Sequence, residues 1–235
     1  IEDMQPVFES TQSLLVELEM DALTQLDLAQ SMLLPDPYRL TDFFSEAEFQ
    51  QIVRLMRGRI EGARLKVVKP WVVFVQLYSA RSDAEQTMDM LIAHNYHQLK
   101  KPVKGLESVS RQLSVFDALS YQQQAALVRR ALEIYQVQSA TLNQRLFQYY
   151  RRGDLINLWV LQEQFVEDMG PIFVPLNQAT LGGRNRDMLE RIMTSTPRAA
   201  QLIAVGALHL PGSDGLLCLL EGKGYRVRPA VLGQR

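Results

Sequence analysis

Cysteine is almost absent from this sequence, since Cys218 is the only one among its 235 residues. A lone cysteine cannot form an internal disulfide, so the fold must be stable without one. A chain of this length can bury enough apolar surface to fold without disulfides or a structural metal ion. The composition therefore indicates an ordinary globular core, and the cysteine content leaves the redox compartment open.

Long hydrophobic runs and blocks of like charge are also missing. No apolar stretch approaches the roughly 18 residues that would predict a membrane-spanning helix, so we expect no such helix. The 25 basic and 26 acidic side chains leave a formal net charge of -1. Because no basic block is present, we do not expect a nucleic-acid partner.

Apolar periodicity predicts many helices and a few short strands. The apolar run over 14–20 is typical of a buried strand, and shorter strands are predicted at 101–107, 201–206 and 225–229. Helices are predicted at 5–12, 22–33, 46–58, from 70 onward, 83–99, 109–168 with two breaks, 185–195 and 214–222. The sequence therefore predicts an α/β fold, in which a helix-rich single domain has a small central mixed β-sheet flanked by helices.

Capping residues mark several of the expected helix ends. Ser45, Ser120 and Asp154 each precede an apolar helical pattern. Ser213 is expected to cap the last helix, and Gly224 is expected to end it.

His209 is the strongest candidate for chemistry. It follows Gly206, which lets the backbone turn sharply where the third predicted strand ends. Ligands of open α/β sheets bind beyond the carboxyl ends of strands, and an imidazole there can ligate a metal or transfer a proton near neutral pH. A loop histidine that only bonds a backbone carbonyl is the alternative that this pattern leaves open.

Two glutamates occupy comparable positions. Glu17 lies in the first apolar strand, where an unpaired carboxylate is costly to bury, and Glu19 shares its face by period-two geometry. Glu107 ends the second predicted strand. These acids are either solvent-exposed strand residues or members of a polar site. We predict that Glu17, Glu107 and His209 converge on one cleft at the same edge of the sheet.

Other polar residues are weaker candidates. His94 and His97 lie three residues apart on a predicted helix and are expected on its solvated face. Arg184 and Asn185 precede a helix, and they are expected either to contact an anionic group or to cap and solvate that helix. Core positions are expected for Cys218, Trp71 and Trp159.

Several stretches together resemble a known family. They are Val205–Gly212 with the residues that follow to Val227, Gly105–Glu107 with Gln112, Leu15–Glu19, Lys69–Trp71 and Arg184–Asn185. These stretches are similar to motifs of the TraB/GumN family, whose wider relatives include the Tiki proteases. The resemblance spans essentially the whole chain, and its most specific part is 205–227.

The resemblance implies an α/β fold with two G-x-x-H elements and acidic residues around a divalent-metal site, for which we expect Mn²⁺ or Co²⁺. It implies that His209 is a metal ligand or catalytic histidine and that Glu17 and Glu107 are metal ligands or general bases. Arg184 would orient the substrate. The expected activity is metal-dependent hydrolysis of a peptide.

One family element is missing, because no G-x-x-H stands upstream of Glu17. The sequence begins at Ile1 without an initiator methionine or the features of a signal peptide. We therefore expect a chain truncated at its N-terminus rather than one that lost the element. The resemblance also leads us to expect an extracytoplasmic location.

Two other functions stay open at this point. The same cleft can bind a peptide, a signal or another small molecule without turnover. Alternatively, the surface around His209 can be a contact within an envelope assembly. The sequence does not predict the oligomeric state.

Overall fold

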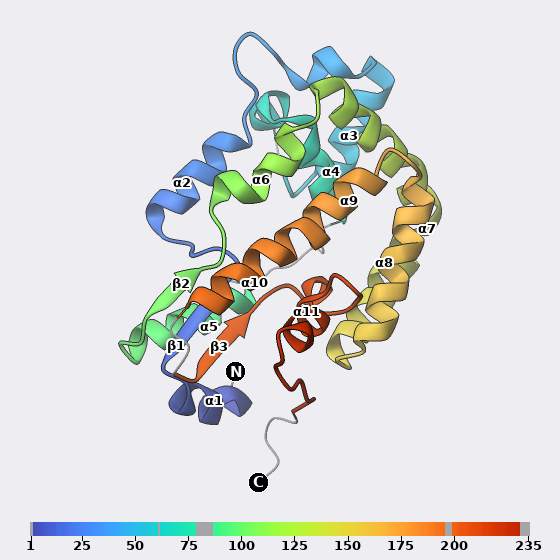
Figure 1. Ribbon diagram of the computed structural model, residues 1–235. Helices are drawn as coiled ribbons and strands as arrows, with labels where there is room; N and C mark the ends of the chain where they lie inside the picture. Colours follow the sequence, from blue (N-terminus) through green and yellow to red (C-terminus); the bar gives the residue numbers. More distant parts are fainter. Residues whose placement is uncertain (1, 61, 79–86, 196–198, 231–235) are drawn as a thin grey trace.

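Helices make up most of the fold, and a small sheet lies at one side of the molecule between some of them (Figure 1). The structure is a computed structural model that describes residues 2–60, 62–78, 87–195 and 199–230. Its α-helices are α1 (Gln5–Ser10), α2 (Ala22–Ser31), α3 (Glu46–Met56), α4 (Pro70–Tyr78), α5 (Met88–Gln98), α6 (Val109–Asp117), α7 (Tyr121–Arg151), α8 (Leu155–Met169), α9 (Val174–Gln178), α10 (Arg184–Thr194) and α11 (Leu216–Gly222). The shorter helical segments are η1 (Glu2–Met4), η2 (Leu40–Phe43), η3 (Gly62–Val67), the π-helix η4 (Ala179–Gly183) and η5 (Ala207–His209).

The sheet consists of parallel strands within the described part of the chain. Its strands, in spatial order, are β2 (Val103–Gly105), β1 (Ser13–Val16) and β3 (Gln201–Ala204). In β1, Leu14 pairs with Val103 on one side and with Leu202 on the other. Because both pairings are parallel, the carboxyl ends of all three strands lie at one edge of the sheet.

The small sheet flanked by helices confirms the predicted fold class, but the expectation of a mixed sheet was wrong. The strand predicted at 225–229 does not form, and Tyr225 is 51% exposed. The Tyr225 backbone N–H instead donates to the Leu220 carbonyl at 3.1 Å and closes the end of α11. Alternating side chains alone do not make a strand, because a strand also needs a neighbour for its backbone hydrogen bonds.

Both faces of the sheet are buried, which explains why β1 is apolar at consecutive positions. Leu14 and Val16 point to one face, where they pack in a cluster with Phe8 of α1 and with Ile92 and Tyr96 of α5. The opposite face carries a second cluster, whose buried members are Leu15, Leu106, Met188, Leu189, Ile192 and Leu216. The sheet is therefore held between α1 and α5 on one side and α10 and α11 on the other (Figure 1).

Most of the predicted helices are confirmed. The first four correspond to α1–α4, and the region 109–168 forms α6, α7 and α8 with breaks at the expected places. The helix predicted at 83–99 is α5, although its residues 83–86 lie outside the described part. The helix predicted at 185–195 is longer than expected, because α9, η4 and α10 follow one another without a break from Val174. Pro175 is tolerated there because it lies in the first turn of α9.

The predicted caps agree with the structure in four cases out of five. Ser45 and Ser120 form capping boxes, and the Asp154 side chain accepts from the N–H of Asn157 at 3.1 Å. Ser213 does not cap the last helix, because α11 begins at Leu216 after Gly215. Gly224 has a φ of 87°, as expected of a glycine that ends a helix.

Two of the predicted core residues are more exposed than expected. Cys218 is exposed, since α11 turns Leu216 toward the core and leaves the cysteine on the outer side. Trp159 is only half-buried, whereas Trp71 lies in the large helical core beside α7, stacked on Phe116 with the ring centroids 4.9 Å apart.

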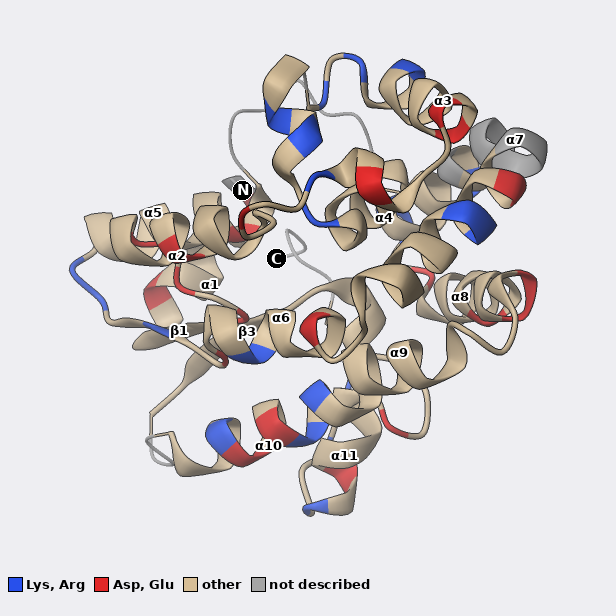
Figure 2. Cartoon of the chain, turned by 90° about the horizontal axis from the view of Figure 1, so that it is seen from above, with Lys and Arg blue, Asp and Glu red and all other residues tan. Residues whose placement is uncertain are grey.

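Charged side chains are spread unevenly over the helices. Figure 2 shows residues of both signs on α10 but only acidic residues on α8, in agreement with the sequence of these two helices. None of the helices in the described residues is both long and apolar enough to cross a membrane.

Low pH should destabilise the N-terminus of α3 by protonating one carboxylate, that of Glu48. Glu48 closes the capping box of Ser45 and receives a hydrogen bond from Arg129 Nε at 2.6 Å, and the Arg129 bond lowers its pKa from 4.5 to about 2. Because the pKa is lowered in the folded state, this stabilisation is complete above about pH 4.5 and is lost as the pH falls toward 2.

We expect Glu48→Gln to lower the free energy of unfolding by about 1–2 kcal/mol at pH 7 and by little near pH 2. Glutamine can still complete a capping box, so the substitution isolates the charge. Urea unfolding across this pH range measures the effect, and Glu46→Gln in the same turn is the control. Parallel stability curves for Glu48→Gln and the unaltered protein would contradict the prediction.

Candidate functional site

Three chain segments bring polar residues to the edge of the sheet where the strands end. Glu17 follows β1 directly, and Glu107 follows β2 by two residues. The two segments run side by side beyond the strands, because the Glu107 N–H donates to the Glu17 carbonyl at 2.9 Å. Glu17 therefore lies just past the strand and not inside it, so the prediction that Glu17 and Glu19 share one face of a strand was wrong.

Arg184, the first residue of α10, joins the two glutamates. Its Nε lies 3.0 and 2.9 Å from the two carboxylate oxygens of Glu107, and its Nη2 also binds Glu107. The same Nη2 donates to Glu17 Oε2 at 2.9 Å. Burial alone would lower the pKa of the guanidinium, but the hydrogen bonds and charge of Glu107, followed by those of Glu17, outweigh it and raise the pKa. Arg184 is thus a buried cation clamped between two carboxylates.

The π-helix η4 lies immediately before this arginine. The Thr180 carbonyl in η4 accepts from Arg184 Nη1 at 3.3 Å, so it provides a further acceptor for the buried guanidinium. π-Helical turns inside helices are rare and often lie beside functional sites. The turn therefore marks the place where the long helix supplies its side chain to the sheet edge.

His209 reaches the same place from the end of β3. The chain turns through η5, in which the His209 N–H donates to the Gly206 carbonyl at 2.9 Å. This turn explains the G-x-x-H spacing, because a bond between residues three apart places the imidazole back over Gly206. The imidazole is buried, and its Nε2 lies 3.7 Å from Glu17 Oε1.

Asn185 fixes the orientation and the tautomer of this imidazole. Its Nδ2 donates to the Asp214 carbonyl at 2.7 Å, and since a carbonyl can only accept, the amide cannot be reversed. Its Oδ1 therefore faces His209 Nδ1 at 2.6 Å, so Nδ1 must carry the proton. In the neutral imidazole this leaves the Nε2 lone pair directed toward Glu17.

Burial lowers the pKa of His209 below its ordinary value. The charge of Glu17 acts in the opposite direction, and the charge of Arg184 adds to the lowering. The neutral imidazole is therefore favoured near neutral pH. A neutral imidazole is the form that accepts a proton or binds a metal ion.

Gly206 allows the close approach on which this arrangement depends. Its backbone N–H donates to Glu17 Oε1, and a side chain at this position would put a Cβ 3.0 Å from the same oxygen. Space favours glycine here, since a Cβ would force the Glu17 carboxylate to move by a few tenths of an ångström, whereas the φ of −56° is open to any residue.

The cluster borders a cavity of about 530 Å³. Glu17 and Gly206 line it together with residues of β3 and α5, and its apolar lining includes Met88, Leu202 and Leu210. Gln112 of α6 is among its polar lining residues. A cavity of this size is within the range that binds small ligands or a few residues of a peptide.

The described residues fit a divalent cation only in part. Within the described ranges no group of three or more His, Cys, Asp and Glu side chains is arranged to hold a metal ion. His209 Nε2 and Glu17 Oε1 are close enough for one ion to reach both, given ligand distances of about 2.0–2.2 Å. Glu107 fits less well, because both of its oxygens are bound by Arg184.

All four candidate residues from the sequence, Glu17, Glu107, Arg184 and His209, lie in this one cluster. Arg184 contacts anionic groups, which was one of its two expected roles. The partnership of Asn185 with the histidine was not foreseen, although its place next to Arg184 could have suggested it. His94 and His97 are exposed on α5, as expected, and do not take part.

Removal of Arg184 should strongly destabilise the fold. Arg184→Met would leave Glu17 and Glu107 beside each other without their cation, and breaking a buried ion pair in this way costs about 3–5 kcal/mol. The expected result is a loss of that order in the free energy of unfolding, measured with urea. Arg186→Met removes an exposed pair with Asp214 and should cost no more than about 1 kcal/mol. Equal losses of unfolding free energy in the two variants would show that the buried contacts of Arg184 stabilise the fold no more than an exposed ion pair does.

Substitution of Gly212 should disturb the loop that carries His209. Gly212 has a φ of 89°, and a Cβ there would lie 3.0 Å from Trp159 Cη2. Gly212→Ala should therefore lower the free energy of unfolding by about 1–3 kcal/mol, through backbone strain and overpacking.

Gly222→Ala is the matched control, because the position at the end of α11 has open space and no unusual φ. Alanine there should be neutral or should stabilise the protein by up to about 1 kcal/mol. Thermal unfolding of both variants measures the difference, and a Gly212→Ala protein as stable as the control would be inconsistent with tight packing on Trp159.

Comparisons with known proteins give one match. The model of the TraB/PrgY/gumN family matches residues 1–229. This is the family that the sequence motifs resemble. Searches of the curated proteins and of the solved structures gave no match.

Proposed function

Since the chain belongs to the TraB/PrgY/gumN family, we propose that the cluster at the sheet edge is a hydrolytic centre that acts on peptides with a divalent cation. One observation carries the proposal. His209 Nε2 lies 3.7 Å from Glu17 Oε1, while its Nδ1 is held by Asn185 Oδ1 at 2.6 Å. In the neutral imidazole Nε2 is an acceptor, so it and the Glu17 oxygen repel each other unless a proton or a cation lies between them.

The chemistry of these two atoms supports a cation. A neutral imidazole nitrogen and a carboxylate oxygen are both ligands that divalent transition metals accept. Mn²⁺ or Co²⁺ bound there would supply Lewis acidity, which polarises a scissile carbonyl and lowers the pKa of water. Burial keeps the imidazole of His209 in the neutral form that this role requires.

The residues around the pair hold it in position. Arg184 binds Glu17 Oε2, so Oε1 stays directed toward the imidazole. Asn185 holds the opposite nitrogen of the ring, as partners of metal-binding histidines usually do. Because Arg184 occupies Glu107, we assign that glutamate to anchoring the guanidinium and not to binding the cation.

The cavity beside the cluster supports a peptide as the substrate. A peptide group presents one donor and one acceptor, and the amide of Gln112 offers both kinds of partner. The apolar wall around Met88 and Leu210 suits an aliphatic side chain next to the bond that is cut. We therefore propose peptides with an apolar residue at that position.

Metal binding is the sharpest test of this proposal. After treatment with a chelator, the protein should bind Co²⁺ in calorimetry, and His209→Ala should weaken binding at least tenfold by removing a ligand. Asn185→Ala should weaken it by about 10- to 100-fold, the usual effect of losing the partner of a ligating histidine. His94→Ala, which changes an exposed histidine on α5, is the control and should leave the affinity within twofold. Equal affinities in the His209→Ala and His94→Ala proteins, or no Co²⁺ binding by the unaltered protein, would rule out this cation site.

Hydrolysis is then measured with a mixture of peptides in the presence of Mn²⁺ or Co²⁺, with the products identified by mass spectrometry. Cleavage that disappears in His209→Ala and persists in His94→Ala supports the proposed centre. The absence of cleavage with either ion would contradict the hydrolytic part of the proposal.

A second function is favoured by one specific observation. The described residues offer two suitable ligands, and no cluster of three was found among them. A protein that binds a peptide through the same cavity without turnover needs no complete metal site. Tight binding of a peptide that is recovered intact, with or without metal, would support this second function over the first.

A further inference from the structure

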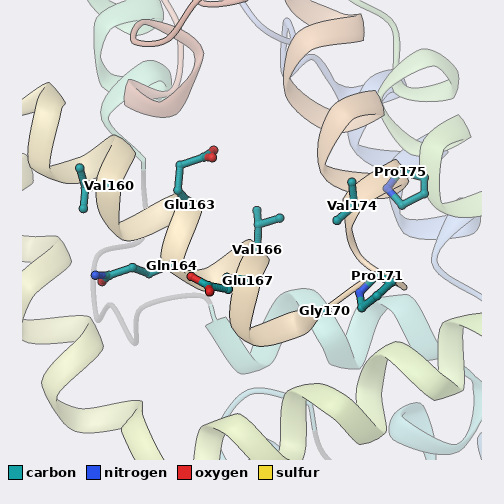
Figure 3. Close-up of a pocket in the computed structure, with 9 residues that line it drawn as sticks. All are labelled: Val160, Glu163, Gln164, Val166, Glu167, Gly170, Pro171, Val174 and Pro175. Atoms are coloured by element: carbon teal, nitrogen blue, oxygen red, sulfur yellow. The ribbon is translucent and has the colours of Figure 1, made fainter.

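A second hollow lies away from the cavity at Glu17, between α8 and the start of α9 (Figure 3). It is an open, shallow hollow of about 750 Å³, lined by residues of α8, of the turn at Gly170 and Pro171, and of α9. A neighbouring hollow of about 730 Å³ shares four of its lining residues, which are Glu163, Val166, Val174 and Pro175. We call the two together the α8–α9 groove.

The α8–α9 groove leads to the back of the loop that carries His209. Its far end is lined by Asn185, which holds the imidazole, and by the loop residues Pro211 and Asp214. The cavity at Glu17 is lined by Leu210 of the same loop. The loop thus forms a wall of both spaces, and an occupant of the groove would lie beside the site but outside it.

The lining combines apolar walls with an excess of negative charge, since its one cation within the described ranges, Arg186, pairs with Asp214 and two glutamates of α8 remain. Val160 and Val174 are 44% and 39% exposed, which is high for aliphatic side chains, and two prolines stiffen the same wall. Glu163 and Glu167 lie four residues apart on one face of α8, where like charges repel. Among the described residues neither glutamate has an ion-pair partner, and α8 itself contains no lysine or arginine (Figure 2).

We propose that the α8–α9 groove is an exosite that binds an extended peptide segment in which basic and aliphatic residues alternate. Basic side chains would pair with Glu163 and Glu167, and aliphatic side chains would cover Val160 and Val174. The peptide is preferred to other occupants because the groove has apolar walls and an excess of negative charge, whereas an anionic ligand or lipid headgroup would be repelled. The name exosite rests on the proposed function, but binding in the groove can be measured without it.

The test is a binding titration that needs no catalysis. The probe is a short fluorescein-labelled peptide of alternating leucine and lysine, followed by fluorescence anisotropy at low ionic strength. Glu163→Gln combined with Glu167→Gln should weaken binding about fivefold, from the loss of two ion pairs at the groove rim. Glu190→Gln combined with Glu221→Gln removes the same charge from exposed positions outside the groove, and it should change the affinity less than twofold.

A second variant fills the groove from its apolar wall. Val174→Arg would place a long basic side chain in the groove opposite the glutamates, and it should reduce binding at least tenfold. Thermal unfolding of each variant shows whether the fold is retained. Equal affinity in the two double variants, unaltered binding in a folded Val174→Arg protein, or equally tight binding of a leucine–glutamate peptide would overturn the proposal.

Two further measurements separate this proposal from neighbouring ones. His209→Ala should bind the probe as the unaltered protein does, so failure of the hydrolytic centre leaves the groove result standing. Self-association that Val174→Arg abolishes, measured by sedimentation, would assign the groove to a second copy of the chain and overturn the peptide proposal.

Discussion

The position of one guanidinium between two carboxylates governs the architecture of this site. Arg184 extends from the first turn of α10 and binds the residues that follow β1 and β2, so helix and sheet are joined by charge as well as by packing. Two carboxylates share a single arginine, and the imidazole beside them is favoured in its neutral form. The cluster therefore keeps an excess of one negative charge, which is the electrostatic condition for attracting a cation.

The parallel arrangement of the strands also determines the architecture of the site. Because β1, β2 and β3 all point the same way, residues that follow each of them meet at one edge although they are far apart in sequence. The two apolar clusters on the sheet faces fix the register of the strands. The register in turn sets where each polar residue lies relative to the others at the edge of the sheet. Apolar packing thus determines where the polar atoms meet, and the ion pairs determine how they are oriented.

Much of the fold could be predicted from the sequence because local signals were strong. Serine caps and helical periodicity gave the helices from α3 to α8, and short apolar runs gave the three strands. The run at Tyr225 was misread because alternation does not reveal whether a neighbouring strand exists. The continuous helix from Val174 was missed because Pro175 and the paired glycines before Arg184 usually indicate the end of a helix.

The members of the site were also predictable, but their contacts were not. Polar residues at the end of an apolar strand identified Glu107 and His209, whereas Glu17 was identified as a carboxylate inside an apolar run, where burial without a partner is costly. No sequence pattern gives the distance between an imidazole and a carboxylate, or shows that Arg184 would bind both glutamates. The role of Asn185 depends on a carbonyl 29 residues away at Asp214, and such a contact appears only in three dimensions.

Gly206 gives the site an unusual mechanical property. Its amide holds the carboxylate of Glu17, and its carbonyl holds the amide of His209. A rotation of the backbone at this single residue would thus shift the acid and the imidazole together and change the gap between them. The torsion angles of Gly206 therefore couple two groups that Arg184 and Asn185 hold from their other sides, so a backbone change at this glycine would act on both at once.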